Sequence, residues 1–274
     1  MKVRDAILLL GAAGVVTLVY GALVEANRLV LERKRIRLHG WPASHSGVKL
    51  AVLADLHVRD RFSAKLATRA VAMAIAARPD FVLIPGDLVA RWSPGALEFL
   101  IEVLFPLAES ELPVIVSLGN HDSEGGSADQ IVSVCEGLGF RVLTNQACRV
   151  GGITFAGIES ANLGRDRAET TMEQAKQLGG PIVVLWHEPD VVDRLPSGAR
   201  LMISGHSHGG QFTFPGGFTP MHTKNGRKYV RGYYPDAPTP LYVSRGVGTT
   251  GPPSRLNCPP EVTLLELIPQ SGAK

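Results

Sequence analysis

The sequence predicts an α/β fold with a layered sheet core, and two observations support this prediction. Short apolar runs typical of buried strands alternate with helical patterns over the first half of the 274 residues, and strand-like segments dominate the last third. Such alternation is typical of parallel strands joined by crossover helices. The length allows a sizeable core, and a composition of 45% hydrophobic and 19% charged residues is that of a globular protein.

The first element is an uncharged run of 19 residues from Ala6 to Val24. As a helix it would be about 28 Å long, close to the thickness of one bilayer core. We therefore expect one transmembrane helix, an uncleaved membrane anchor over residues 1–27. The alternative is a cleaved secretory signal, which typically has a shorter apolar region followed by small residues at a cleavage site.

Basic residues are more numerous after this run than before it. Lys2 and Arg4 precede the run, and five follow it: Arg28, Arg33, Lys34, Arg35 and Arg37. The positive-inside rule therefore predicts that the rest of the chain lies in the cytoplasm, with the exported side as the alternative. Residues 28–47 are expected to form a basic juxtamembrane segment with an edge strand, and residues 48–270 the main domain.

The main domain is expected to alternate strands and helices in the following order. Strands are predicted within 48–55 and 80–87, each ending in an acidic residue, within 112–122, where the strand runs into polar residues, and within 181–190 and 199–210. Helices are predicted at 64–78, 95–107, 127–138 and 168–178. Further strand-like pieces lie at 141–145, 147–159, 210–215, 239–246 and 261–268. The stretch 215–240 is rich in proline, glycine and tyrosine, and we expect a long loop or a small hairpin there.

Polar residues that can bind metals follow five of the apolar runs. They are Asp55 and His57, Asp87, the triplet Asn120, His121 and Asp122, the single His187, and the pair His206 and His208. Five of the eight histidines fall in these positions. Each block alone is typical of a cap or a turn. Their conjunction favours one shared site, because ligands of open α/β sheets bind at the carboxyl ends of the strands.

The residue types at these positions indicate a pair of metal ions. Imidazole and carboxylate without thiolate suit Zn, Mn or Fe, and the three cysteines fit no zinc-ligand spacing. The candidates are too many for one tetrahedral ion, and Asp87 offers two oxygens that can bridge two ions. Two-metal sites polarise a phosphoryl group and generate a hydroxide at neutral pH. The sequence therefore predicts hydrolysis of a phosphate ester.

The five blocks, in this order, resemble the signature of the calcineurin-like metallophosphoesterases. That signature, D-x-H, GD, GN-H-D/E, a lone H and GH-x-H, covers residues from about 48 to 268 of this chain. "GHSHGGQ" and the C-terminal segment resemble a small bacterial branch whose members often carry an N-terminal anchor or export signal. The resemblance implies a four-layer α-β-β-α sandwich in which two mixed sheets lie face to face with helices outside.

The resemblance also implies a role for each residue. One ion would be held by Asp55, His57, Asp87 and His208, and the other by Asp87, Asn120, His187 and His206. A hydroxide between the ions would attack phosphorus in line. His121 would stabilise the transition state or protonate the leaving oxygen, and Asp122 would orient its ring.

Three further expectations concern the substrate. Arg245 is a candidate phosphate ligand, with a packing arginine as the alternative. A predicted anchor near the site favours a lipid-linked or cell-envelope substrate such as UDP-diacylglucosamine. A net charge of +3 with no basic stripe argues against nucleic acid. A non-catalytic metal-binding scaffold and a nuclease or protein phosphatase remain the alternative functions.

Overall fold

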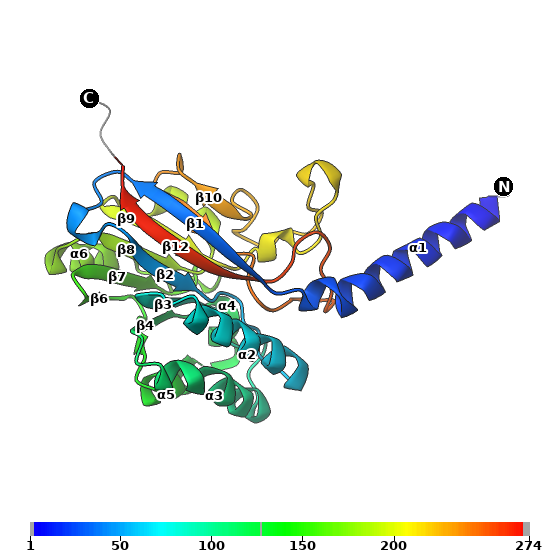
Figure 1. Cartoon of the computed structure of the whole chain (residues 1–274), viewed down its shortest axis with the longest axis horizontal. Helices are drawn as coiled ribbons and strands as arrows, with labels where there is room; N and C mark the ends of the chain where they lie inside the picture. Colours follow the sequence, from blue (N-terminus) through cyan, green and yellow to red (C-terminus); the bar gives the residue numbers. More distant parts are fainter. Residues whose placement is uncertain (1–2, 127, 271–274) are drawn as a thin grey trace.

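The computed structural model describes residues 3–126 and 128–270, and its core is two six-stranded sheets packed face to face (Figure 1). The first sheet has the order β1 (Val30–Leu38), β12 (Glu261–Pro269), β2 (Val48–Val52), β3 (Phe81–Pro85), β4 (Val114–Ser117) and β5 (Arg141–Val142). The second has the order β10 (Gly232–Tyr234), β11 (Leu241–Val243), β9 (Ala199–Ser204), β8 (Ile182–Trp186), β7 (Ile153–Ile158) and β6 (Gln146–Val150). Both sheets mix parallel and antiparallel pairs, which confirms the expected mixed sheets.

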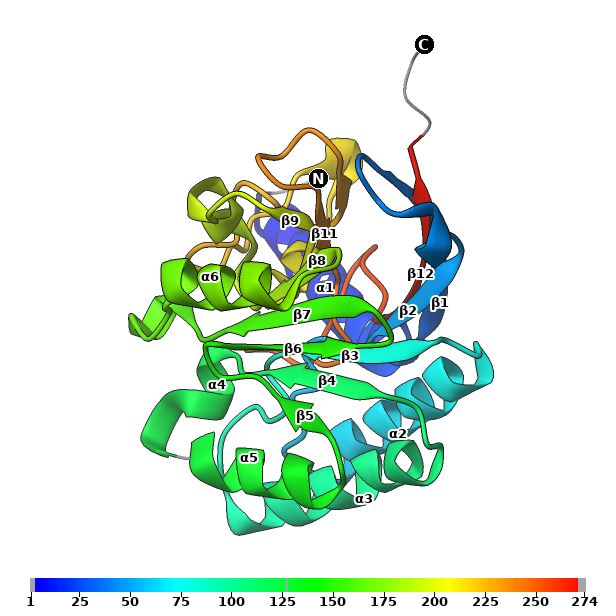
Figure 2. The ribbon, with the colours of Figure 1, turned by 90° about the vertical axis from the view of Figure 1, so that its left-hand side faces the viewer.

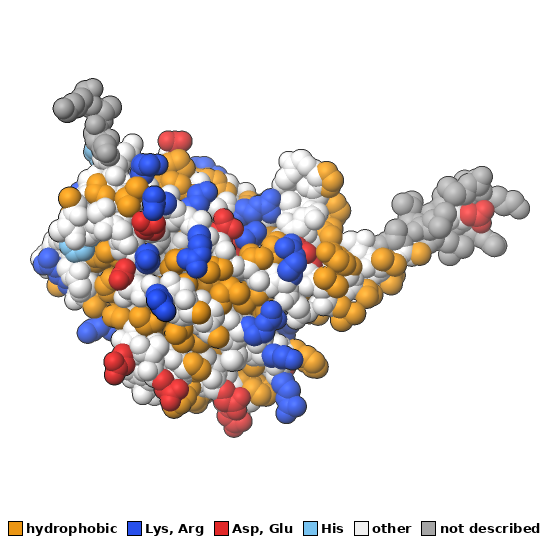
Figure 3. Space-filling view, viewed as in Figure 1, with side chains coloured by type: hydrophobic (Ala, Val, Ile, Leu, Met, Phe, Trp, Pro, Cys, Tyr) orange, Lys and Arg blue, Asp and Glu red, His pale blue; other side chains and the backbone are white. Residues whose placement is uncertain are grey.

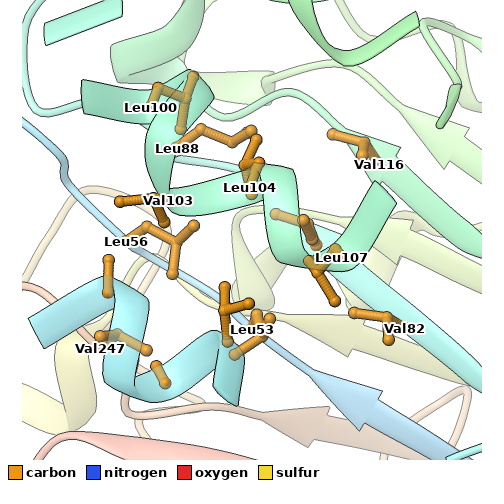
Figure 4. Packing of buried hydrophobic residues seen from close by; sticks show 14 of the residues in the cluster. Leu53, Leu56, Val82, Leu88, Leu100, Val103, Leu104, Leu107, Val116 and Val247 are labelled. Atoms are coloured by element: carbon orange, nitrogen blue, oxygen red, sulfur yellow. The ribbon is translucent and has the colours of Figure 1, made fainter. Parts of the chain in front are cut away.

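Helices form the two outer layers, as Figure 2 shows. The first sheet is covered by α2 (Arg61–Ala76), α3 (Pro94–Glu109) and α5 (Ala128–Gly137), and the second by α6 (Ala168–Leu178). Three apolar clusters separate these four layers. Figure 4 shows the cluster between the first sheet and its helices. In it, Leu53, which follows β2, and Val116 of β4 pack with Leu104 and Leu107 of α3. The expected α-β-β-α sandwich is therefore confirmed.

Strand β2 explains why the strands that carry the site appear as continuous apolar runs. Leu50 and Val52 lie in the cluster between the two sheets, whereas Ala51 and Leu53 lie in the cluster beneath the helices. Successive side chains of a strand point to opposite faces, and here both faces are buried. The polar residues that follow such a strand therefore begin where the apolar layers end, and they are themselves buried.

The segment before residue 48 is part of the same sheet. Strand β1 pairs in parallel with β12 from Val30 to Leu38 and lies at the sheet edge, which confirms the predicted edge strand. Before it, α1 (Val3–Leu23) projects away from the body (Figure 1). In the part of the chain that the structure describes, no helix is both long enough and apolar enough to cross a membrane. Within the run predicted as an anchor, the side chains at positions 6–10 and 13 lie outside the part that the structure describes.

One local prediction is wrong. Residues 210–215, predicted as strand-like, form helical turns and a single bridge between Phe212 and Leu256, because Gly209, Gly210 and Gln211 all have positive φ angles. Within residues 112–122 the strand β4 ends at Ser117 and runs into polar residues as predicted, and the short helix α4 (Asn120–Ser123) that follows was not predicted. The stretch 215–240 is mostly loop and supplies the short strand β10, which pairs with β11.

Candidate metal centre

The polar residues predicted at strand ends all follow parallel strands of the two sheets. Asp55 and His57 follow β2, Asp87 follows β3, Asn120 and His121 begin α4 after β4, His187 follows β8, and His206 and His208 follow β9. The two sheets meet at β3, β4 and β8, which brings the carboxyl ends of these strands to one edge. The seven predicted ligands are all buried there.

One group of ligand atoms comes from Asp55, His57 and His208, which lie within 4.8 Å of one another. Nε2 of His57 is 3.0 Å from Nε2 of His208. Oδ1 of Asp55 is 3.7 Å from Nε2 of His208 and 3.9 Å from Nε2 of His57. Two ring nitrogens and a carboxylate oxygen therefore converge on one point, as the ligands of one metal ion do.

A second group comes from Asp87, His187 and His206, again within 4.8 Å. Oδ2 of Asp87 is 3.0 Å from Nε2 of His187 and 3.4 Å from Nε2 of His57. Because His57 belongs to the first group, the Asp87 carboxylate lies between the two groups. This is the position of a ligand shared by two ions.

Backbone carbonyls orient two of the imidazoles. Nδ1 of His187 is 2.7 Å from the carbonyl of Pro85, and Nε2 of His206 is 2.7 Å from the carbonyl of Lys224. A carbonyl only accepts, so these nitrogens carry the protons. The opposite nitrogens, Nε2 of His187 and Nδ1 of His206, are therefore the ones available to a metal, which is the usual arrangement behind a metal-binding histidine.

The backbone of the ligand loops is left-handed at five non-glycine residues, a conformation that L residues adopt at a cost of about 1–2 kcal/mol each. They are Asp55, His57, Asp87, His206 and His208, with φ between 47° and 70°. Ser207, where we expected the bend between the two histidines, has an ordinary helical φ of −75°. The histidines themselves turn the chain, and their rings join different groups.

Glycines make room for the carboxylates. A Cβ on Gly119 would overlap the carboxylate of Asp87, and a Cβ on Gly205 would overlap that of Asp55. A larger residue at either position would displace the ligand loop. The glycine of each GN and GH block is therefore a packing requirement of the neighbouring carboxylate.

The electrostatics show buried charges that lack full compensation. Burial raises the pKa of Asp55 to about 7 and lowers the pKa of His57 to about 3. Burial acts against charge at Asp87 and His187 too, yet each favours the charged form of the other, so the pKa of Asp87 falls and that of His187 rises. The two buried carboxylates therefore lie close together with only His187 favoured in a cationic form, and a divalent cation would compensate their negative charge.

Four buried polar atoms within the described residues have no hydrogen-bond partner at this centre. They are Nδ1 of His57, Oδ1 of Asn120, Nε2 of His187 and Nδ1 of His208. Buried polar groups without partners are rare and costly. Oδ1 of Asn120 and Nε2 of His187 fit the donor set of a divalent metal such as Mn, Zn or Fe, whereas His57 and His208 direct Nε2 rather than Nδ1 toward the ligand groups.

His121 lies beside the ligands and is partly exposed. Its Nδ1 is 2.8 Å from the carbonyl of Ala90, which leaves Nε2 for the site. A cavity of about 290 Å³ adjoins the ring, lined by Ala90, Arg91, Trp92, His121 and Glu124. Arg91 and Trp92 carried no signal in the sequence, because they lie outside the five blocks.

Asp122 has a different role from the one expected. Its carboxylate accepts hydrogen bonds from the backbone N–H groups of Asp87, Leu88, Val89 and Gly119 at 2.7–3.2 Å. These bonds hold the Asp87 loop against the start of α4. The carbonyl of Ala90 orients the ring of His121, so the expectation that Asp122 does so is corrected.

Arg245 is occupied by other partners. Its guanidinium forms an ion pair with the buried Glu261 and lies 3.5 Å from Glu32. It is therefore a packing arginine of β1 and β12, the alternative that the sequence had left open, and no phosphate contact is assigned to it.

Glu188 and Asn162 support the ligand loops and were not predicted from the sequence. Glu188 is fully buried and accepts from Ser160 and from the backbone of Ala161 and Asn162. The amide nitrogen of Asn162 is 3.1 Å from Nε2 of His206. The sequence offered one signal for Glu188, its position next to His187, because the residues that donate to it lie 26 to 28 positions earlier in the chain.

Arg255 is also fully buried and was not foreseen. Its guanidinium donates to the carbonyls of Arg245, Gly246, Gly248 and Cys258, and one nitrogen lies 3.5 Å from the carbonyl of His208. It thereby links the loop after β11 to the loop that carries His208. An arginine among glycines and prolines gives no sequence pattern from which this could be predicted.

Comparison with known proteins gives two findings. A family model described as calcineurin-like phosphoesterase matches residues 48–210. Among individual proteins, the chain is 32% identical to phosphodiesterase YaeI of Escherichia coli over 239 residues, which covers 85% of this chain and 87% of that protein. It is 26% identical to the uncharacterized metallophosphoesterase YkuE of Bacillus subtilis over 257 residues, which covers 90% of this chain and 88% of that protein.

Proposed function

The chain belongs to the calcineurin-like phosphoesterase family and is a hydrolase of phosphate esters, and we propose that it cleaves phosphodiester or pyrophosphate bonds with a pair of divalent metal ions. The observation that best supports a metal pair is the carboxylate of Asp87 between the two ligand groups. Asp55, His57, Asp87 and His208 would hold one ion, and Asp87, Asn120, His187 and His206 the other.

The ions would supply a water of lowered pKa and a polarised phosphoryl group. The chain supplies the remaining groups. In its doubly protonated form, His121 keeps its Nδ1 proton on the Ala90 carbonyl and gives its Nε2 proton to the leaving oxygen, which leaves the ring neutral. The leaving group occupies the cavity beside Trp92 and Arg91. Asp122 keeps the Asp87 loop in place while charge builds up at phosphorus.

Metal depletion and reloading test this function. We expect the chelator-treated full-length enzyme to lose hydrolysis of bis(p-nitrophenyl) phosphate, and Mn, Zn or Fe to restore it as two ions bind per chain. Elemental analysis gives the stoichiometry, and a panel of monoesters, diesters and sugar nucleotides gives the preference. A depleted enzyme as active as the loaded one would contradict the proposal.

The finer part of the proposal concerns substrate and location. The uncharged run of residues 6–24 and the exposed apolar side chains of α1, such as Val15, Val16 and Val19, support a membrane attachment. An enzyme attached in this way would act on a lipid-linked or cell-envelope compound such as UDP-diacylglucosamine. The basic residues after the run support a cytoplasmic catalytic domain.

Fusion reporters test this location. Green fluorescent protein attached after Lys274 should fluoresce in a membrane fraction that resists salt and alkaline washing. Alkaline phosphatase at the same position should stay inactive, because it matures only outside the cytoplasm. The reverse pair of results would place the domain on the exported side, and a fusion that remains in the supernatant would contradict the anchor.

A further inference from the structure

A groove of about 630 Å³ lies at the base of α1. The end of α1, the start of α2 and the loop from Gly248 to Pro253 form its walls. Its apolar lining includes Leu23, Ala26, Phe62, Leu66 and Pro253. Phe62 is 85% exposed and Leu23 is 72% exposed, so large apolar side chains face solvent at its rim. Figure 3 shows hydrophobic side chains gathered at this base of α1. The volume is typical of a ligand site.

The wall that α1 provides is fastened to the body. The hydroxyl of Ser254 donates to the carbonyl of Leu18, and the backbone N–H of Arg255 donates to the carbonyl of Gly21, both at 3.2 Å. A Cβ on Gly21 would overlap Ser254, so the two segments are in close contact. The groove is therefore a feature built by three segments that lie far apart in the sequence.

Four of the polar side chains that line the groove, those of Asn27, Arg59, Asp60 and Ser63, already have partners within the protein. Nη1 of Arg59 donates to the carbonyl of Thr249 at 3.1 Å, and Ser63 and Asp60 bond to each other as the cap of α2. The amide of Asn27 donates to the carbonyls of Ala22 and Leu23. With these groups paired, the groove offers an occupant mainly apolar contact.

The groove adjoins the metal centre at Gly248. The N–H of Gly248 donates to the carbonyl of Asp55 at 2.6 Å, and a Cβ on this glycine would lie 2.7 Å from Cβ of His57. Arg59 follows His57 by two residues and lines the groove. The wall of the groove is therefore in contact with the loop that carries two of the metal ligands.

We propose that this groove binds an acyl or alkyl chain of the substrate, so that the enzyme acts on phosphate esters of lipids. The proposal rests on the proposed phosphoesterase function and adds the site that selects the apolar arm. Three observations support it: the exposed apolar rim, the mostly paired polar lining, and the contact of the groove wall with the backbone of Asp55 and with Cβ of His57.

A series of water-soluble esters tests the groove directly. The substrates are p-nitrophenyl alkyl phosphates with methyl, butyl, hexyl and octyl chains, used with the full-length metal-loaded enzyme. Each methylene that enters the groove should raise kcat/KM about fourfold, equivalent to about 0.8 kcal/mol. The octyl-to-methyl ratio should therefore be on the order of 10² if about four methylenes are buried.

Variants identify the groove as the source of this ratio. Ala22→Trp places an indole in the groove and should lower the octyl-to-methyl ratio at least about tenfold. Val19→Trp adds the same bulk to the same helix outside the groove lining and should leave the ratio unchanged. Phe62→Ala removes a side chain that is 85% exposed, so the variant should fold. It should lower the octyl-to-methyl ratio of kcat/KM more than the butyl-to-methyl ratio.

Binding provides a second result that does not depend on turnover. Calorimetry should show that octyl phosphate binds the full-length protein more tightly than methyl phosphate, and that Ala22→Trp removes the difference. If the methyl ester is hydrolysed and kcat/KM does not change with chain length, the groove does not bind the alkyl chain, and the phosphoesterase function still stands. Equal binding of the two phosphates would also overturn the proposed role of the groove. Chain-dependent binding without any hydrolysis would support the groove and contradict the proposed function.

Discussion

Replacing Asp87 by asparagine should lower kcat/KM for bis(p-nitrophenyl) phosphate by about 10³-fold or more and reduce the bound metal below two ions per chain. Asp87 is the carboxylate that lies between the two ligand groups, 3.0 Å from His187 and 3.4 Å from His57. The amide removes the negative charge and one anionic oxygen from the shared position. Steady-state kinetics and elemental analysis of the purified variant measure the two effects.

A matched control comes from the other end of the same strand. Asp80 precedes β3, is exposed, and accepts a hydrogen bond from the backbone N–H of Lys49 at 2.7 Å. Asp80→Asn should therefore keep both ions and the full rate. If Asp87→Asn also kept two ions per chain and lost less than tenfold in rate, the shared-ligand interpretation of Asp87 would be wrong.

The meeting of the five blocks at one edge could be predicted because strand direction brings the blocks of each sheet together and the face-to-face packing expected of the sandwich brings the two sheets together. Parallel strands that are buried on both faces must end in polar loops at a common edge, so Asp55, Asp87 and His187 could be expected to lie together. The alternation that identified these strands depends on local side-chain patterns, which the sequence displays directly. The edge strand β1 was predicted for the same reason.

The features that could not be predicted depend on partners remote in the sequence. Asp122 bonds to the backbone of residues 87–89, and Arg255 bonds to carbonyls at residues 245–248. Backbone bonds carry no sequence signature, so the first was misassigned and the second was missed. The groove has the same origin, because α1, α2 and the 248–253 loop adjoin only in the fold.

Replacing His121 by alanine should cause a loss of rate that depends on the leaving group. For a phosphodiester with an alkyl leaving group, kcat should fall by about 10²–10⁴-fold, because the departing alkoxide needs a proton. For a p-nitrophenolate leaving group, which departs without protonation, the loss should be about tenfold or less. Plotting log kcat against the pKa of the leaving alcohol or phenol measures the difference as a steeper slope in the variant.

Metal content decides between this role and direct ligation. Ligand atoms of His121, His57 and Asp87 also lie within 4.8 Å of one another, so the ring is placed close enough to bind an ion. A proton donor can be removed without loss of metal, whereas a ligand cannot. We therefore expect His121→Ala to keep two ions per chain. The control His222→Ala replaces an exposed histidine outside the cluster and should also keep both ions. Loss of an ion from His121→Ala, with equal rate losses for both leaving groups, would instead identify His121 as a ligand.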